Sequence, residues 1–229
     1  MTDIDVKMRI VPPIILDRVS VDLGPWSGYH VLAQYPMIPS VNMKIAILGG
    51  GFNPPHLGHL LICQQVLSFT DNEEVWLVPY FAHPWEKPAI TSRHRFNMAK
   101  MMENDKISVS DLEMKLKRKN YTYETVDIIK QKYSHHDFSW IIGSDLYQEF
   151  FTWEKASDIV KKMRILVFPR VGWPIGELPD DFYTTRDKLL TTSDISSEKI
   201  REMVKLGLSI KGLVLPQIEK YIVKHSLYK

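Results

Sequence analysis

Short apolar runs separated by helical stretches restrict the fold of this chain more than any other feature. Five runs of three to five residues, at 45–48, 75–78, 107–109, 138–142 and 165–168, are almost entirely apolar. Such runs are typical of strands buried on both faces of a sheet. Between them the apolar period becomes helical, as at 122–133 and 218–225. This alternation predicts an α/β fold: a Rossmann-like doubly wound, mostly parallel sheet with helices on both faces.

The composition is that of a globular chain with a core of its own. The 229 residues are 45% hydrophobic, and the formal net charge is only +2. The single cysteine excludes a disulfide framework, and the balanced charge gives no indication of a nucleic-acid partner. No apolar run reaches the roughly 18 residues that a membrane helix needs. We therefore expect a cytoplasmic protein with no nucleic-acid or membrane partner, and a homo-oligomer is possible.

Residues 1–42 differ from the rest of the chain. They contain five prolines and follow no helical or strand period. The chain then restarts at Met43 with an apolar run that resembles the usual first strand of a protein. We expect an N-terminal extension of irregular structure over 1–42, followed by the α/β domain over 43–229. The extension is interpreted as an accessory arm, as a partner-docking segment, or as the result of an upstream start codon that was assigned in error.

The turn after the first predicted strand carries the strongest functional signal. It contains Gly49, Gly50, Gly51, Phe52, Asn53, Pro54, Pro55, His56, Gly58 and His59. The glycines predict a sharp turn that approaches a ligand closely, and the prolines predict a helix start whose N-terminus faces phosphate. On that helix His56 and His59 share a face, with room for a bulky group at Gly58. We interpret them as donors to phosphate oxygens; a metal-ligand pair and two merely exposed histidines are the alternatives.

This turn resembles the His-x-Gly-His signature of the nucleotidyltransferase superfamily, because the glycines, Phe52-Asn53-Pro54 and both histidines coincide. It lacks the Gly-Lys-Ser/Thr ending of a Walker loop and is not a dinucleotide fingerprint. Later segments resemble the nicotinate (or nicotinamide) mononucleotide adenylyltransferases of that superfamily. The resemblance covers 43–229 and implies a nucleotidyltransferase domain there.

Two of these segments concern the pyridine mononucleotide. Gly143, Asp145 and Trp153 are similar to the family's Gly-x-Asp…Phe-x-x-Trp element, which implies that Asp145 holds ribose hydroxyls and that Trp153 stacks on the pyridine ring. Without that register, Trp153 is interpreted as a core residue. Tyr121 and Thr122 belong to a stretch similar to Ser-Tyr-Thr-x-x-Thr, whose backbone amides face the pyridine carboxylate or carboxamide. Asn120 replaces the leading serine and is expected to cap the helix.

Other segments concern the phosphates. Lys87 lies in a loop that resembles the one after the family's second strand, and we expect it to reach a phosphate. Ser196, Ser197 and Arg201 fall in a stretch similar to Ile-Ser-Ser-Thr-x-Ile-Arg, which implies a clamp for the leaving pyrophosphate. Glu198 replaces the usual threonine of that stretch, and Gly51 replaces a usual serine or threonine. Both departures remove hydroxyls from the phosphate side.

The roles of two basic stretches are left open between two interpretations each. Arg93, His94 and Arg95 either correspond to a basic residue that the family commonly has on this helix or form a structural ion pair. The stretch 115–119, which holds three lysines and one arginine, is either a solvated loop or the rim of a site for a phosphorylated ligand.

The resemblance implies transfer of AMP from MgATP to nicotinate mononucleotide, which gives deamido-NAD and pyrophosphate. His56, His59 and Arg201 would then be catalytic. The remaining site residues divide into ATP-binding Gly49, Gly50, Gly51, Phe52, Asn53, Gly143, Asp145, Ser196 and Ser197 and acceptor-binding Lys87, Tyr121, Thr122 and Trp153. No protein metal site is expected, because Mg²⁺ arrives with ATP. The alternatives are adenylyl or cytidylyl transfer to nicotinamide mononucleotide or another phosphate such as phosphopantetheine, and a nucleotide-binding protein with a degenerate site.

Overall fold

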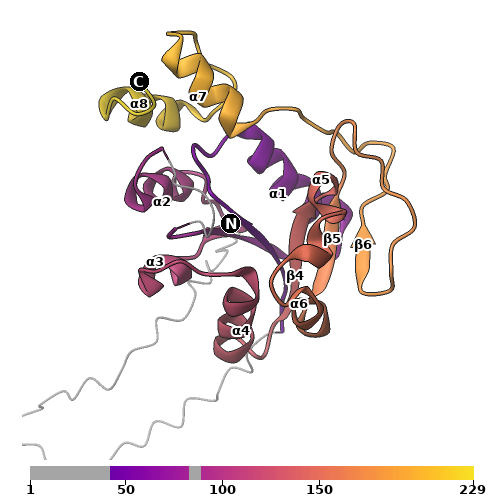
Figure 1. The fold of residues 1–229 in the computed structure, drawn as a ribbon. Coiled ribbons are helices and arrows are strands. Elements are labelled where there is room, and N and C mark those ends of the chain that lie inside the picture. Colours follow the sequence, from indigo (N-terminus) through magenta and orange to yellow (C-terminus); the bar gives the residue numbers. More distant parts are fainter. Residues whose placement is uncertain (1–41, 83–88) are drawn as a thin grey trace, which may run out of the picture. The chain divides into compact units, whose positions relative to one another are not determined.

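A parallel sheet organises the computed structural model, which describes residues 42–82 and 89–229 (Figure 1). In this part of the chain six strands form one sheet in the order β3-β2-β1-β4-β5-β6, and every neighbouring pair is parallel. The strands are β1 (Lys44–Gly50), β2 (Glu74–Pro79), β3 (Ile107–Val109), β4 (Asp137–Gly143), β5 (Arg164–Phe168) and β6 (Phe182–Thr184). This is the doubly wound order, in which ligands bind beyond the carboxyl ends of the central strands.

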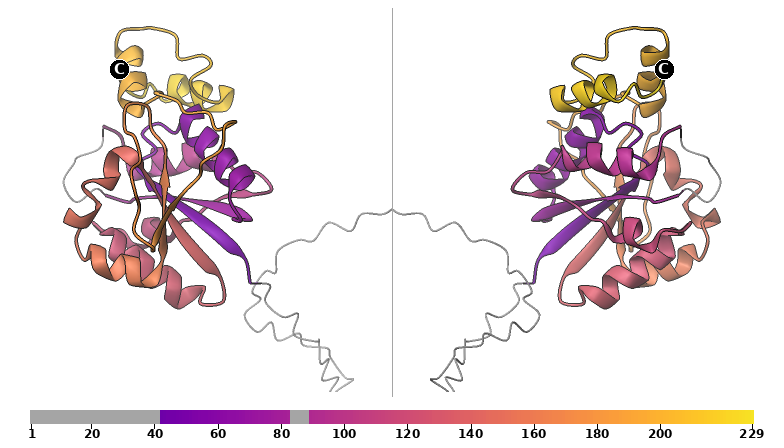
Figure 2. Two further views of the ribbon diagram at one scale, coloured as in Figure 1. Left: turned by 90° about the vertical axis from the view of Figure 1, so that its right-hand side faces the viewer. Right: turned by 90° about the vertical axis from the view of Figure 1, so that its left-hand side faces the viewer.

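Helices cover both faces of the sheet (Figure 2). One face packs against α1 (Leu57–Phe69), α2 (Ser92–Lys100), α7 (Ser197–Lys205) and α8 (Pro216–Lys224). The other packs against α3 (Leu112–Leu116), α4 (Thr122–Lys132) and α6 (Ala156–Lys162). Two short helices, α5 (Ser144–Tyr147) and η1 (Phe150–Thr152), follow β4.

Strand β1 illustrates why the apolar runs are continuous rather than alternating. Ala46 and Leu48 point into the core beneath α1, whereas Ile45 and Ile47 point into the core beneath α4, and all four are buried. A strand covered on both faces needs an apolar residue at every position. The predicted fold class is therefore confirmed, together with the five predicted strands and the helices at 122–133 and 218–225, which are α4 and α8.

Strand β6 was not predicted from the sequence. It has only three residues and lies at the edge of the sheet, where Phe182 alone is buried. An edge strand exposed to solvent carries no apolar run, so no periodic signal marks it.

The expected N-terminal extension lies outside the described residues, apart from Asn42. The described residues, 42–82 and 89–229, belong to one compact unit. No helix within the described ranges is long and apolar enough to cross a membrane.

Candidate active site

The loop between β1 and α1 turns at a phenylalanine rather than at its glycines. Gly49 and Gly50 are the last residues of β1, and Phe52 adopts the left-handed φ of 48°. A Cβ at Gly49 would lie 2.5 Å from Cζ2 of Trp140, so packing against β4 demands glycine at that position. The expectation that the three glycines themselves form the sharp turn is wrong, because strand pairing to β2 continues through Gly50.

Helix α1 begins two residues after the prolines. His56 is its N-cap and Leu57 its first residue, while the Asn53–Pro54 peptide bond is cis. The expectation that the prolines open the helix is therefore wrong. Instead, residues far along the chain hold the loop before α1.

Three side chains from the C-terminal part anchor that loop. The Arg201 guanidinium donates to the Asn53 carbonyl (2.9 Å), and the Ser197 hydroxyl donates to the Pro54 carbonyl (2.7 Å). The hydroxyl of Tyr228 donates to Oδ1 of Asn53 (2.9 Å). Ser197 and Arg201 thus contact the loop between β1 and α1, residues 51–56, which we call the phosphate loop. Through these two side chains, α7 fixes the backbone of the phosphate loop.

The two histidines lie together at the start of α1, as their spacing predicts. Their ring centroids are 3.8 Å apart, and Nδ1 of His59 accepts the backbone N–H of His56 (3.2 Å). Because Nδ1 accepts, the proton of neutral His59 is on Nε2, which can donate to a ligand. The expected room at Gly58 is wrong: a Cβ there would lie 2.9 Å from Nδ1 of His56, so the His56 ring already fills that space.

Burial and a neighbouring cation keep both imidazoles neutral. His56 is only 5% exposed, and burial, helped by the charge of Arg170, lowers its pKa to about 4. The pKa of His59 falls well below its usual value through burial and the charges of His56 and Arg170. At neutral pH the free protein therefore presents N–H donors rather than cations. Arg170, which comes two residues after the end of β5, supplies the positive charge.

The carboxyl end of β4 holds the predicted ribose-binding aspartate. A Cβ at Gly143 would collide with the carboxylate of Asp145, so glycine lets that side chain fold back over the strand end. Nε of Arg170 lies 3.8 Å from Oδ1 of Asp145. Trp153 is half-buried, with its ring centroid 5.2 Å from that of Phe150, so it both packs on the core and reaches the surface.

Helix α4 begins at Thr122, and its N-cap is Tyr121, whose backbone N–H donates to the Glu124 carboxylate (3.0 Å). The expectation that Asn120 caps this helix is wrong. Asn120 is buried, and its side-chain amide donates to the hydroxyl of Thr125. The predicted residues Tyr121 and Thr122 nonetheless stand at the helix start, where the first N–H groups have no intrahelical partner.

Helix α7 uses its first serine as a cap. The Ser196 hydroxyl accepts the backbone N–H of Lys199 (3.2 Å), and Glu198 is exposed in the first turn. A carboxylate in that position interacts favourably with the helix dipole. Glu198, which replaces the usual threonine of the family, therefore lies on the solvent side of α7, where its charge stabilises the helix start.

Arg95 has a role that the sequence did not resolve. It is fully buried and donates to three carbonyls, those of Gly51 (2.8 Å), Tyr80 (2.7 Å) and Phe81 (2.8 Å). Among the described residues its partners are backbone oxygens rather than a carboxylate, so the ion-pair interpretation finds no support for Arg95 in this part of the chain. Its neighbour Arg93 is exposed.

Two residues near the site were not predicted from the sequence, Tyr80 and Arg170. Tyr80 comes one residue after the end of β2, and Arg170 comes two residues after the end of β5. Position directly after a parallel strand is the signal that could have found both. Lys87 lies outside the described residues. Lys115 lies in the last turn of α3 rather than in a loop, and the three lysines and the arginine of 115–119 are all exposed.

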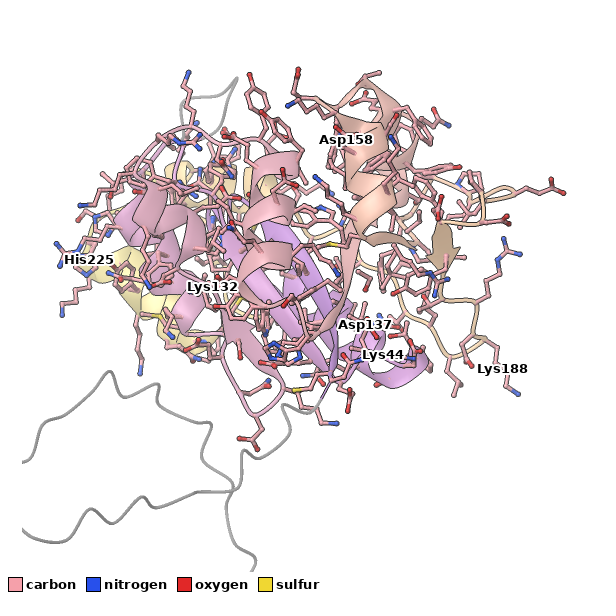
Figure 3. All side chains as sticks on the ribbon, turned by 90° about the horizontal axis from the view of Figure 1, so that it is seen from below. Lys44, Lys132, Asp137, Asp158, Lys188 and His225 are labelled. Carbon is pink, nitrogen blue, oxygen red and sulfur yellow. The ribbon has the colours of Figure 1, made fainter. Side chains whose placement is uncertain are left out.

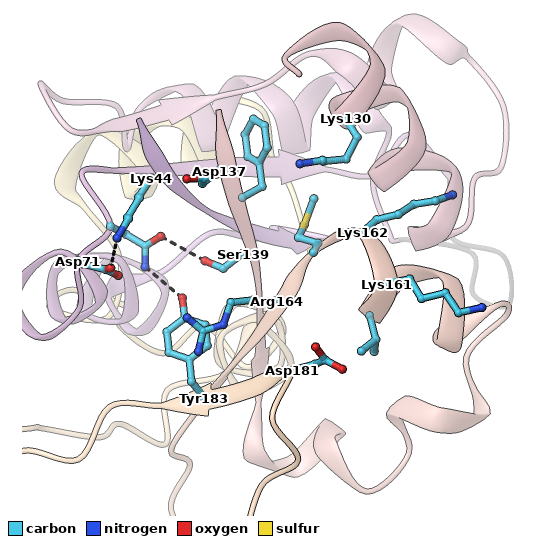
Figure 4. A pocket seen from close by; sticks show the side chains of 14 residues that line it. Lys44, Asp71, Lys130, Asp137, Ser139, Lys161, Lys162, Arg164, Asp181 and Tyr183 are labelled. Carbon is cyan, nitrogen blue, oxygen red and sulfur yellow. Dashed lines mark hydrogen bonds and ion pairs between the residues drawn. The ribbon is translucent and has the colours of Figure 1, made fainter. Parts of the chain in front are cut away.

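A separate hollow of about 400 Å³ lies at the amino ends of the strands, on the opposite side of the sheet from the phosphate loop (Figure 4). Lys44 and Asp137, the first residues of β1 and β4, line it together with Arg164, and Figure 3 labels the first two at this edge. No predicted site residue contributes to it. Among the described residues, no three histidine, cysteine or acidic side chains gather closely enough to hold a metal ion.

Comparison with known proteins agrees with this geometry. The cytidylyltransferase-like family model matches residues 47–203. A protein of Caldicellulosiruptor saccharolyticus named "Probable nicotinate-nucleotide adenylyltransferase" is 35% identical over 197 residues, covering 82% of this chain and 100% of its own. A protein of the same name from Shouchella clausii is 33% identical over 189 residues, covering 81% and 96%.

A solved structure has the same fold. The Plasmodium falciparum nicotinic acid mononucleotide adenylyltransferase in complex with NaAD superposes with a TM-score of 0.71 at 23% identity, covering 82% of this chain and 98% of that one. The histidine pair at the start of α1 lies beside the carboxyl end of β1, and the similarity to the relatives extends over almost their whole length. This chain therefore belongs to the nicotinate-nucleotide adenylyltransferase family, within the cytidylyltransferase-like nucleotidyltransferases.

Proposed function

We propose that this protein transfers the adenylyl group of MgATP to nicotinate mononucleotide, releasing deamido-NAD and pyrophosphate. The observation that carries the proposal is the contact between His56 and His59 at the start of α1, beside the carboxyl end of β1. The family membership and the names of the relatives support the same reaction. A cytoplasmic location would follow from the use of these metabolites.

In this reaction a 5′-phosphate oxygen of the acceptor attacks the α-phosphorus of ATP, and the bond from that phosphorus to the bridging oxygen of the β-phosphate breaks. The attacking phosphate is already ionised, so no general base is needed. Catalysis then depends on positioning and on stabilising charge as it develops. We assign this role to the N–H groups of His56 and His59.

The phosphates that leave would be held at α7. Arg201 supplies a cation there, and its bond to the Asn53 carbonyl fixes its position relative to the phosphate loop. Arg170 adds a second cation near the histidines. Gly49, Gly50, Gly51 and Phe52 would offer backbone groups to ATP. Mg²⁺ would enter as part of the ATP complex, which lowers the charge that these residues must neutralise.

The acceptor would lie across the ends of β4 and α4. Asp145 would accept the ribose hydroxyls, and Trp153 would stack on the pyridine ring. The first N–H groups of α4, at Thr122 and Tyr123, would receive the ring carboxylate, since a helix N-terminus favours an anion. A helix start that binds anions favours nicotinate over the neutral nicotinamide. Lys87 would reach a phosphate, and Gly143 leaves space for the Asp145 carboxylate.

The test is pyrophosphate release by the purified protein with MgATP, with product masses measured for nicotinate mononucleotide, nicotinamide mononucleotide and phosphopantetheine in parallel. We expect turnover with nicotinate mononucleotide and a product of the mass of deamido-NAD. Faster turnover with either other acceptor would overturn the proposed substrate. If ATP raises the melting temperature but no acceptor reacts, the site binds nucleotide without transferring it.

A further inference from the structure

The space that a side chain at position 51 would occupy is filled by the ring of Tyr80, the residue directly after β2. A Cβ at Gly51 would lie 2.8 Å from the phenol oxygen of Tyr80 and 3.2 Å from its Cε1 and Cζ atoms. The hydroxyl of Tyr80 thus occupies the region that a serine or threonine hydroxyl at position 51 would reach. Glycine is required here because the phenol takes the space.

Two contacts fix the position of Tyr80, one to its backbone and one to its ring. The backbone N–H of Tyr80 donates to the Gly50 carbonyl (3.1 Å), which fixes the start of the loop after β2 against the end of β1. The Arg95 guanidinium lies 4.3 Å from the Tyr80 ring centroid and also binds the Gly51 and Tyr80 carbonyls. A fully buried arginine that joins both segments makes this geometry rigid rather than incidental.

The position of Tyr80 favours one of the two substrates. Two residues later, Ala82 forms a parallel bridge with Lys119, just before the start of α4. This bridge places the loop after β2 beside the segment that leads to Tyr121 and Thr122, where the pyridine ring of the acceptor would bind. The ATP clamp at Ser197 and Arg201 instead contacts Asn53 and Pro54, further along the loop.

We infer that Tyr80 is a substrate-positioning residue whose hydroxyl donates a hydrogen bond to the 5′-phosphate of the acceptor mononucleotide, in place of a hydroxyl at position 51. The inference rests on the proposed function and names a further contact of the same site. A phenol donating to a phosphate oxygen forms a charge-assisted hydrogen bond, which is stronger than a neutral one. Gly51 is then a paired change with Tyr80 rather than a sign of a degenerate site.

The first experiment measures binding of nicotinate mononucleotide, of the riboside that lacks its phosphate, and of MgATP to the wild type and to Tyr80→Phe by calorimetry. We expect the variant to bind the mononucleotide roughly ten-fold or more weakly, with unchanged affinity for the riboside and for MgATP. Tyr133→Phe, at the far end of α4, is the matched control and should bind all three like the wild type.

Three results would overturn the inference: wild-type affinity in Tyr80→Phe, an equal loss for the riboside, which indicates a structural role, or a loss confined to MgATP. The proposed function fails separately, if the wild type itself does not turn over nicotinate mononucleotide.

A second experiment restores the hydroxyl at position 51. Gly51→Ser alone should impair turnover, because its Cβ meets the Tyr80 oxygen. In the Tyr80→Phe background that oxygen is gone, and the remaining ring contacts of 3.2 Å need a shift of only a few tenths of an ångström. The double variant should therefore recover part of the kcat/KM lost in Tyr80→Phe. A double variant no better than the worse single variant contradicts the exchange of hydroxyls.

Discussion

At the scale of single residues, the histidine pair links sequence and chemistry most directly. The spacing of three places both rings on one side of the α1 terminus, and the backbone N–H of His56 fixes the tautomer of His59. A neutral imidazole held in this way can donate to phosphate without carrying charge into a buried site. Its contribution to the reaction should exceed its contribution to folding.

We predict that His59→Ala lowers kcat by about 10²-fold or more, because one donor to the developing charge is lost. The melting temperature should change by only a few degrees, since the ring is half-buried and the His56 N–H at the helix start can turn to water. Steady-state pyrophosphate release and thermal melting measure the two effects. His135→Ala, an exposed histidine before β4, is the control. Near-wild-type kcat in His59→Ala would refute the assigned role.

At the scale of elements, Arg95 connects α2 to the ends of β1 and β2. Arg95 has no carboxylate partner among the described residues, and burying a guanidinium in that way is costly, so burial lowers its pKa. Three carbonyl acceptors compensate for this cost. The helix thereby holds the phosphate loop and the loop after β2 at a fixed separation.

Replacing Arg95 with methionine, which keeps apolar bulk, should leave those three carbonyls without their donor. We predict a loss of about 2–4 kcal/mol in the free energy of unfolding, measured by urea denaturation, and a raised KM for the acceptor. Arg93→Met, on the exposed side of the same helix, should change neither quantity appreciably. Equal stabilities of the two variants would show that the carbonyl contacts are dispensable.

At the scale of the whole molecule, buried ionisable groups set opposing pH dependences of stability. Burial raises the pKa of Glu113 to about 7 from 4.5, although its carboxylate accepts the Thr125 hydroxyl (2.6 Å) and neighbours Asn120. The folded state therefore binds this proton more tightly, and its contribution to stability is lost as pH rises from 4.5 through 7. His56 acts oppositely: with a folded pKa of about 4 against 6.5, it makes folding more favourable as pH rises across that window.

In Glu113→Gln the pH dependence of stability that Glu113 causes is removed, so the opposite dependence caused by His56 should become visible. Relative to the wild type, we predict that the variant gains about 2 kcal/mol in the free energy of unfolding between pH 4.5 and pH 8, because glutamine has no proton to lose. Urea denaturation across this range measures the difference. Glu154→Gln, which removes an exposed carboxyl, is the matched control. A difference between Glu113→Gln and wild type that does not vary with pH would contradict the prediction.

Features that depend on residues close together in the sequence could be predicted, and features that depend on distant residues could not. The five buried strands, the two periodic helices and the histidine pair are encoded in patterns a few residues long, and these predictions are confirmed. The start of α1 and the capping of α4 depend on neighbouring segments as well, and there the predictions were wrong.

Only the tertiary structure decided what surrounds the phosphate loop. Arg95 reaches Gly51 across 44 positions of sequence, Arg201 reaches Asn53 across 148, and Tyr228 reaches Asn53 across 175. No local period encodes such contacts, because they exist only once the strand order brings β1, β2 and the C-terminal helices to one edge of the sheet. The sequence alone determined the five buried strands, the two periodic helices and the paired histidines, whereas packing between distant segments determined why residue 51 is glycine.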